Sequence, residues 1–315
     1  MDSRTRAYVP IDGETPEKLF ERALGFIQNI QEKVKDKGDD GLKIMSKMIT
    51  KQMIDVVFGS NAIEGAGLGL EETVKICDRI FRGEMVDPER DPEDEQASIS
   101  PIALPKPTET RFAASHIIRS RREVVQHALA LEYIVNEMVV KERLLSEDII
   151  RETHRILTEK IDAPGGTPWR KYAGRYRHIQ VHAGSTNFAT PKFVPKEMRE
   201  LIREFNSNIQ EAEQNKTLDP FTLGAKYCND FILIHPFVDR NGRVCRLILN
   251  AILLRYAGVV VALGEHDESR KEYLDIQRRA GEHMEGSGEL ATLVLKKATA
   301  KYRTIKQKLA GKRRK

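Results

Sequence analysis

Residues 235–246, HPFVDRNGRVCR, place a histidine, a carboxylate, an amide and two arginines within twelve positions. The proline, aspartate, asparagine and glycine of this segment interrupt the helical periodicity on either side, which predicts a loop between two apolar helices. Asn241 is predicted to cap the second helix. Helix N-termini expose unpaired N–H groups and a partial positive charge, so this position is suited to an anion such as phosphate.

The side chains of this segment match the needs of phosphate chemistry. Arg243 and Arg246 lie three residues apart, hence on one helix face, and their side chains point back toward the helix N-terminus. Asp239 supplies a carboxylate of the kind that binds Mg²⁺ together with phosphate oxygens. His235 is a candidate general base. A histidine after an apolar helix is more often a core or capping residue, so the prediction depends on the combination of residues.

The segment resembles the signature of Fic-domain proteins, HPFx(D/E)GNGRxxR. Eight of its nine fixed positions match with unbroken spacing: His235, Pro236, Phe237, Asp239, Asn241, Gly242, Arg243 and Arg246. The resemblance extends from about Glu123 to Tyr273. It includes the GRYR turn at residues 174–177 and a segment similar to the target-positioning flap of the family. Such proteins typically transfer AMP from ATP to a hydroxyl of a protein.

The resemblance implies a role for each matched side chain. His235 would take the proton from a Ser, Thr or Tyr hydroxyl as that hydroxyl attacks the α-phosphorus of ATP, and Asp239 would hold Mg²⁺ against the phosphates. The Asn241 amide and the Gly242 N–H would stabilise the α-phosphate charge. The two matched arginines would bind the β- and γ-phosphates, and pyrophosphate would leave. Catalysis of this kind comes mainly from positioning and electrostatics.

One position departs from the family pattern, because Arg240 stands where these proteins usually have glycine and sometimes alanine. If the backbone there needs a positive φ, an arginine costs on the order of 1–2 kcal/mol in strain. The guanidinium would either add a phosphate contact or obstruct the pocket. We therefore expect Arg240 to tune nucleotide binding.

A second motif, SNAIEG at residues 60–65, fits the [S/T]xxxE[G/N] inhibitory motif of many Fic proteins. Ser60, Glu64 and Gly65 are its fixed positions. A serine followed by a glutamate also occurs by chance at helix starts, so the match gains its weight from the Fic-like context. The resemblance implies that Glu64 pairs with Arg246 and withdraws that arginine from the γ-phosphate. In some animal Fic enzymes the same glutamate also supports removal of AMP.

Helical periodicity dominates the chain and predicts a mainly α fold, a Fic-type helical bundle with one small β-hairpin flap. Helices are expected at residues 16–38, 42–56, 71–82, 111–161 with a break before Ser146, 220–234, 241–257 and 290–309. Two β-rich runs, 175–184 and 187–194, flank Gly184-Ser185-Thr186 and predict the hairpin.

Composition suggests how the chain is divided. Residues 84–95 hold seven acids and one base, and residues 88–107 hold five prolines, which is typical of a loop or linker. The expected organisation is an N-terminal helical region with the inhibitory motif at 1–83, an acidic, proline-rich loop or linker at 84–110, a Fic catalytic domain at 111–295, and a basic C-terminal helix or tail at 296–315.

The net charge of +5 hides an uneven distribution. Residues 296–315 contain seven lysines, three arginines and no acid, which leaves residues 1–295 with a net charge of −5. This acidic body argues against a nucleic-acid partner. Apolar residues of the tail recur at helical spacing, which favours a final helix docked on the domain.

The remaining signals concern the compartment. No secretory signal or membrane span is recognisable, and the three cysteines lack Cys-x-x-Cys spacing. We expect an intracellular, cytoplasmic protein, with nuclear import through the terminal KRRK kept open. A protein substrate with an acceptor hydroxyl is the expected partner, and a homodimer stays open.

The sequence thus predicts a protein adenylyltransferase that uses ATP and Mg²⁺ and is autoinhibited by Glu64. Two enzymatic alternatives stay open: a bifunctional de-AMPylase, and transfer of another nucleotide-type donor. The non-enzymatic alternative is a Fic-like nucleotide-binding protein in which Arg240 disables turnover.

Overall fold

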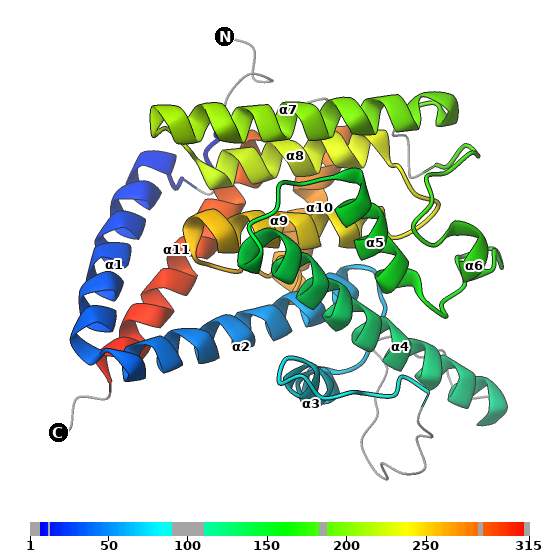
Figure 1. Cartoon of the computed structure of the whole chain (residues 1–315), viewed down its shortest axis with the longest axis horizontal. Helices are drawn as coiled ribbons and strands as arrows, with labels where there is room; N and C mark the ends of the chain where they lie inside the picture. The colour runs from blue at the N-terminus through cyan, green and yellow to red at the C-terminus, as the bar shows by residue number, and fades with distance from the viewer. Residues whose placement is uncertain (1–6, 12, 90–109, 183–187, 283–285, 312–315) are drawn as a thin grey trace.

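The computed structural model of the chain is a bundle of helices (Figure 1). It describes residues 7–11, 13–89, 110–182, 188–282 and 286–311. The helices are α1 (Pro16–Lys37), α2 (Asp39–Ile63), α3 (Leu70–Ile80), α4 (Thr110–Val135), α5 (Glu147–Thr158), α6 (Trp169–Tyr172), α7 (Val194–Asn215), α8 (Pro220–Ile234), α9 (Asn241–Ala257), α10 (Asp267–Glu282) and α11 (Gly288–Ala310). A π-helical turn (Asn136–Val140) follows α4, and a 3₁₀ turn (Pro191–Phe193) precedes α7. The prediction of a mainly α fold is confirmed.

Several helix starts follow the local chemistry of the sequence. The Ser146 hydroxyl accepts the Ile149 N–H at 3.2 Å and caps α5. The Asp219 carboxylate accepts the Phe221 N–H at 3.0 Å before Pro220 opens α8. These side chains satisfy N–H groups that would otherwise lack partners in the first turn. Both helix starts lie where the sequence predicts them.

Helix α9 forms the centre of the bundle and lies between α8 and α2 in Figure 1. Twelve of its 17 residues are buried, among them Val244, Leu247 and Ile248, each with no exposed surface. A helix that is apolar on nearly every side is stable only when neighbours surround it. The loop of residues 235–240 therefore joins two buried helices, α8 and α9, whose ends fix it in place.

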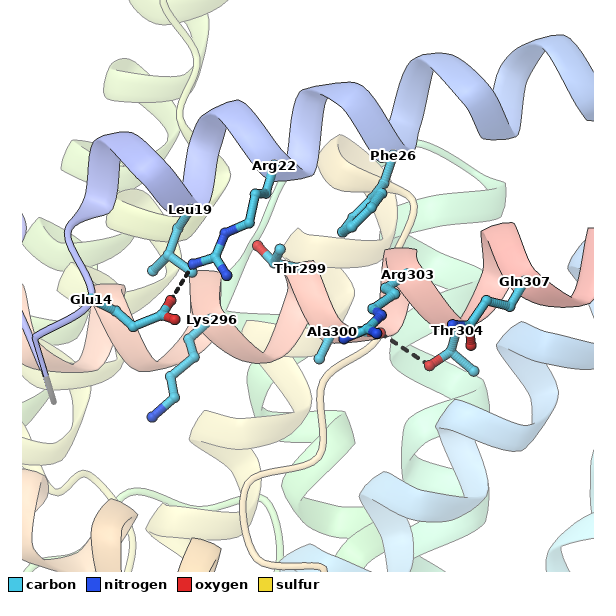
Figure 2. Close-up of a pocket in the computed structure, with 10 residues that line it drawn as sticks. All are labelled: Glu14, Leu19, Arg22, Phe26, Lys296, Thr299, Ala300, Arg303, Thr304 and Gln307. Carbon is cyan, nitrogen blue, oxygen red and sulfur yellow. Dashed lines mark hydrogen bonds and ion pairs between the residues drawn. The ribbon is translucent and has the colours of Figure 1, made fainter.

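Helix α11 packs along α1 at one side of the bundle (Figure 1). Its apolar positions Leu290, Val294, Ala298, Tyr302, Ile305 and Leu309 are all buried. The docked final helix is thus confirmed, and the predicted boundary between residues 295 and 296 falls inside it. A groove of about 570 Å³ runs between α1 and α11 (Figure 2), and the residues that line it include neither sequence motif.

Helix α2 carries the second motif at its C-terminal end, where Ser60 lies in the last turn and Glu64 follows the helix. The chain turns sharply at Gly38, with φ +53, so that α2 crosses the bundle toward α9. Gly59 and Gly264 make close contact here: a Cβ built on Gly264 would lie 2.6 Å from the Gly59 carbonyl oxygen. Only glycine permits this approach between α2 and the segment after α9.

The predicted hairpin differs from what is observed. Residues 174–182 and 188–195 contain no paired strands, and the predicted turn at Gly184-Ser185-Thr186 lies outside the described residues. The second predicted strand, 187–194, is helical at its end, because Pro191 opens a 3₁₀ turn and Val194 begins α7. Proline fits the first turn of a helix, where its missing N–H costs nothing.

Two further expectations concern the linker and the membrane. Residues 90–109 of the predicted linker lie outside the described residues, and α4 begins at Thr110. Among the helices described, none combines the length and the apolar character needed to cross a bilayer.

Candidate active site

The loop between α8 and α9 is held by its own residues. His235 and Arg240 both adopt left-handed backbone conformations, with φ +50 and +64. The Asn241 side chain bonds back to Phe237, accepting its N–H and donating to its carbonyl, each at 2.9 Å. Asn241 is therefore the first residue of α9 and Arg240 occupies the cap position. The predicted N-cap at Asn241 is wrong, because its amide is used to close the loop.

His235 ends α8 with its ring in a defined orientation. Its Nδ1 lies 3.3 Å from the Ile232 carbonyl oxygen. Because a carbonyl only accepts, Nδ1 carries the proton in this contact and Nε2 keeps its lone pair. The Phe188 ring stacks on the imidazole at 3.9 Å. Burial lowers the pKa of His235 to about 4, and the charge of Arg177 acts in the same direction. The ring is thus neutral and able to accept a proton at neutral pH.

Arg246 is bound by the second motif. Its Nε donates to the Ser60 hydroxyl at 2.8 Å, and its Nη2 donates to the Ser60 carbonyl at 3.1 Å and to Glu64 Oε1 at 2.6 Å. The Tyr273 ring covers the guanidinium at 5.7 Å. The pair that the sequence predicts between Glu64 and Arg246 is present, and Arg246 is 3% exposed.

The Glu64 carboxylate lies at the N-terminus of α9. A Cβ built on Gly242 would lie 3.0 Å from both Glu64 Oε1 and Arg246 Nη1, so a side chain there would crowd these two charged groups. Burial alone would raise the pKa of Glu64, but the charges of Arg246, Arg243 and Arg240 outweigh it and hold the pKa below its usual value. A side-chain anion therefore occupies the place that the sequence predicts for phosphate.

Two further arginines of the loop and α9 share one carboxylate. Glu123 of α4 accepts from Arg243 Nη1 through Oε2 and from Arg240 Nη2 through Oε1, the latter at 2.7 Å. All three residues are at most 5% exposed. The Nε atoms of Arg240 and Arg243 are buried, with no hydrogen-bond partner among the described residues. Buried donors of this kind are usually satisfied by water or a bound group.

Asp239 is the candidate metal ligand. Its Oδ1 accepts the Arg240 N–H at 2.7 Å, and its Oδ2 accepts the Arg240 guanidinium at 2.5 Å. No cluster of three metal-ligating side chains occurs in the part of the chain that the structure describes. Mg²⁺ needs no such cluster when phosphate oxygens supply most ligands, and each carboxylate oxygen keeps a spare lone pair. The residues thus fit a nucleotide-borne Mg²⁺, with Arg240 competing for the same carboxylate.

His154 of α5 supports this loop, although it belongs to no motif recognised in the sequence. Its Nδ1 accepts the Gly174 N–H at 2.9 Å, so the other nitrogen, Nε2, is the one that donates to the Asp239 carbonyl at 3.2 Å. The ring stacks on Phe237 at 3.8 Å. Burial lowers the pKa of His154 to about 3, which keeps the ring neutral and this tautomer fixed.

Sequence reasoning finds the loop arginines but misses the groups that orient them. Glu123 appears as one acid directly after two arginines of a helical run, and Arg177 only as the last letter of the GRYR turn. Nothing in the spacing of the sequence links Glu123 to Arg243, 120 residues away. No local signal marks Glu123, because its neighbours on the same helix face, Arg119, Ser120, Gln126 and His127, are polar as well.

The comparisons with known proteins agree with this geometry. The sequence model of the Fic/DOC family matches residues 144–253, from before α5 to near the end of α9. Protein adenylyltransferase fic-1 of Caenorhabditis elegans is 31% identical over 178 residues, which is 56% of this chain and 31% of that protein. Protein adenylyltransferase Fic of Drosophila melanogaster is 30% identical over 177 residues, 55% of this chain and 32% of that protein. The matched stretch is about a third of the length of these relatives.

Solved structures share the fold. A Fic-domain signaling protein from Bacteroides thetaiotaomicron superposes with a TM-score of 0.64 at 20% identity, over 91% of this chain and 97% of that chain. A fragment of Fic-1 from C. elegans gives 0.62 at 24% identity, over 92% and 72%. These structures share the helical fold of this chain, and residues 144–253 match the Fic/DOC family.

Proposed function

We propose that this chain is a protein adenylyltransferase, which transfers AMP from ATP to a hydroxyl of a protein and is held inhibited by Glu64. The observation that carries the proposal is the position of a neutral His235 on the loop that leads into the N-terminus of α9, where Arg243 and Arg246 converge. The names of the curated relatives support the same activity.

In the proposed reaction, His235 Nε2 accepts the proton of the target hydroxyl as its oxygen attacks the α-phosphorus. The N–H groups at the start of α9, with Gly242 among them, and the side chains of Arg243 and Arg246 stabilise the negative charge of the phosphates. Asp239 would hold Mg²⁺, which supplies further positive charge to the phosphates. The bond between the α-phosphorus and the bridging oxygen breaks, and pyrophosphate leaves.

The proposed inhibition follows from competition for one guanidinium. Arg246 already donates to Ser60 and Glu64, so a nucleotide must displace the Glu64 carboxylate before its terminal phosphate gains this arginine. Of the carboxylates at the site, Glu64 is the most accessible, with 35% of its side chain exposed against 5% for Glu123. ATP that binds without displacing Glu64 lies out of line for attack.

The exposure of Glu64 also favours a second function. Its carboxylate reaches solvent at the edge of the site, where it can orient a water molecule for hydrolysis of an AMP–protein bond. The alternative in which Arg240 blocks turnover has less support, because its side chain is fully buried against Glu123 and Asp239. The proposal implies a protein target; a cytoplasmic location and a homodimer stay expectations.

Transfer of AMP is tested by following two labels. We expect the Glu64→Gly variant to attach label from α-labelled ATP to protein and to attach none from γ-labelled ATP. The further change His235→Ala should abolish incorporation, while His266→Ala, which removes an exposed histidine outside the site, should leave it intact. Attachment of the γ-label, or full incorporation without His235, contradicts the proposed chemistry.

A further inference from the structure

Arg177 is buried, and among the residues that the structure describes no carboxylate is hydrogen-bonded to its guanidinium. It is 2% exposed, and its guanidinium donates to four backbone carbonyls. Burial lowers the pKa of Arg177, and the charge of Glu197 acts in the opposite direction without pairing with it. A buried charge without a paired carboxylate is costly, so its retention here requires that its donors be well used.

The four carbonyls belong to two parts of the molecule. Two are at the end of α8: Arg177 Nε donates to the His235 carbonyl at 2.6 Å and Nη2 donates to the Ile234 carbonyl at 3.2 Å. The other two lie on either side of residues 183–187: Nη1 donates to Ile179 at 3.0 Å and Nη2 donates to Ala189. One side chain thus joins the candidate base to the two chain segments beside it.

Backbone contacts reinforce this junction. The Arg177 N–H donates to the Pro236 carbonyl at 2.8 Å, and the Ala189 N–H donates to the Leu233 carbonyl at 3.2 Å. Phe188, next to Ala189, stacks on the His235 ring at 3.9 Å. The residues around Ile179 and Ala189 therefore keep a fixed place relative to His235.

An arginine suits this position for geometric reasons. The last carbonyls of α8 lack intrahelical partners and carry the negative end of the helix dipole, which favours a cation. His235 has φ +50, so its carbonyl leaves the helix direction and needs a separate donor. A planar guanidinium has five N–H groups in a rigid fork and reaches all four carbonyls, whereas the three donors of a lysine radiate from a single atom.

Resting on the function proposed above, we propose that Arg177 is a positioning residue for AMP transfer. It fixes the His235 backbone and the segments at Ile179 and Ala189 as one unit, so that a hydroxyl presented beside them meets His235 Nε2. The hydrogen bonds of its guanidinium all go to these carbonyls, and none goes to Asp239. The chemical step therefore depends on Arg177, and ATP binding does not.

The test uses the full chain with Glu64→Gly as the parent. Arg177→Lys keeps the charge and loses the fork, so we expect kcat for AMP transfer to fall about a hundredfold, as for a misplacement of about 1 Å. The Kd of a non-hydrolysable ATP analogue, measured by calorimetry, should stay within about twofold. Guanidinium ion should partly restore the kcat of Arg177→Ala, which a loss of fold would not allow.

Arg151→Lys is the matched control. Arg151 donates from Nε to the Gly174 carbonyl at 2.8 Å in the same turn and lies over the Tyr176 ring, but it bonds to no atom of His235. Its replacement should leave kcat near that of the parent. An unchanged kcat in Arg177→Lys, or equal losses in kcat and in ATP affinity, would overturn the proposal.

A second readout separates this inference from the proposed function. The nitrogen chemical shifts of His235 report its tautomer by NMR without any turnover. We expect the Nδ1–H form in the parent and a mixture of tautomers in Arg177→Lys. If the parent shows no AMP transfer, the proposed function fails, and the tautomer still decides the positioning role: an unchanged His235 spectrum in Arg177→Lys overturns it.

Discussion

At the scale of single residues, three buried arginines meet three carboxylates. Arg246 pairs with Glu64, Arg243 with Glu123, and Arg240 with both Glu123 and Asp239. Buried charges of one sign need such partners, because an unpaired charge in a protein interior is strongly destabilising. An anionic ligand can enter this cluster only where a carboxylate can leave it. Glu64 meets that condition, since it follows the end of a helix and keeps contact with solvent.

Arg240 is expected to raise the Mg²⁺ requirement of ATP binding. Its guanidinium bonds to Asp239 Oδ2 at 2.5 Å, next to the place a divalent cation would occupy. In Arg240→Gly, the Mg²⁺ concentration for half-maximal ATP binding should fall about tenfold, equivalent to about 1.4 kcal/mol. Titration calorimetry measures this Mg²⁺ concentration, and the His235→Ala variant serves as the parent so that no turnover occurs. Arg240→Lys, which keeps a cation there, is the control; an unchanged requirement in Arg240→Gly argues against this role.

The site residues differ in how far the sequence could reveal them. Contiguous residues, such as His235 through Arg246, are recognisable because their chemistry and spacing lie in one segment. The backbone of Arg240 does adopt a positive φ, +64, as the glycine of the family pattern suggests. Glu123, His154 and Arg177 come from other segments, and each acts on the loop through contacts that form only when the helices pack. Their roles depend on tertiary distances, which local patterns do not encode.

At the scale of elements, the position of α2 decides where Glu64 lies. Three contacts fix its C-terminal half: the Asn61 carboxamide bonds to His127 at 3.0 Å, Gln52 accepts the Val260 N–H at 3.0 Å, and Gly59 lies against Gly264. The first joins α2 to α4, and the other two join it to the segment after α9. Glu64 is therefore positioned by the whole end of α2 rather than by its own ion pair.

Gly264→Ala should loosen this docking. The new methyl would lie 2.4 Å from Ile63 Cγ1 and 2.6 Å from the Gly59 carbonyl oxygen, so α2 must shift. We expect a loss of about 1–3 kcal/mol in the free energy of unfolding, as for overpacked cores, and a rise in basal AMP transfer. Urea denaturation and a transfer assay measure the two effects. Gly25→Ala, where a Cβ meets nothing within 4 Å, is the control and should be slightly stabilising. A Gly264→Ala protein that is as inhibited as wild type would show that α2 docking does not matter.

Helices are the elements that the sequence predicts best here. Their apolar periodicity and caps, such as Ser146 and Asp219, act within a few residues. Helices α7 and α10 nevertheless lie outside the predicted ranges. The short helix α6 and the π-helical turn of residues 136–140 have no comparable local signal. The β-rich composition of 187–194 was misleading, since Pro191 and the following helix start outweigh β propensity, and strands need a partner that local composition cannot supply.

At the scale of the whole molecule, the net charge says little about the substrate. The basic residues of 296–311 belong largely to α11, whose apolar face is docked in the bundle. Lys297 and Lys301 of this helix pair with Glu265 and Asp55 on neighbouring segments, at 3.1 and 3.0 Å. The positive charge that we propose to meet a nucleotide is the buried cluster at α9, in a body that is otherwise acidic.

Two buried histidines, His127 and His154, and the half-buried His235 should make the fold sensitive to mild acid. Burial lowers the pKa of His235 to about 4 and that of His154 to about 3, and it holds the pKa of His127 well below 6.5. The unfolded chain then binds more protons than the folded chain below pH 6.5, so stability is full above that pH and falls as the pH drops. Each histidine contributes a slope of about 1.4 kcal/mol per pH unit once the unfolded form is protonated.

Chemical denaturation at several pH values between 5 and 7 measures how the free energy of unfolding changes with pH. Carboxylates titrate below this range and so contribute little to the slope. His154→Gln should lower the slope of the free energy of unfolding with pH by the contribution of about one proton. His266→Ala, which removes an exposed histidine, should leave that slope unchanged. Stability that is constant from pH 7 to pH 5 is incompatible with neutral buried histidines.

The central claim is that the Glu64 carboxylate occupies the anion site of a nucleotide and holds Arg246 away from it. The most direct measurement is the initial rate of AMP incorporation from α-labelled ATP, for wild type and Glu64→Gly at equal concentration. With Arg246 released, we predict that the variant is faster by at least about tenfold, which corresponds to about 1.4 kcal/mol of transition-state stabilisation. Equal rates in the two proteins would contradict the claim.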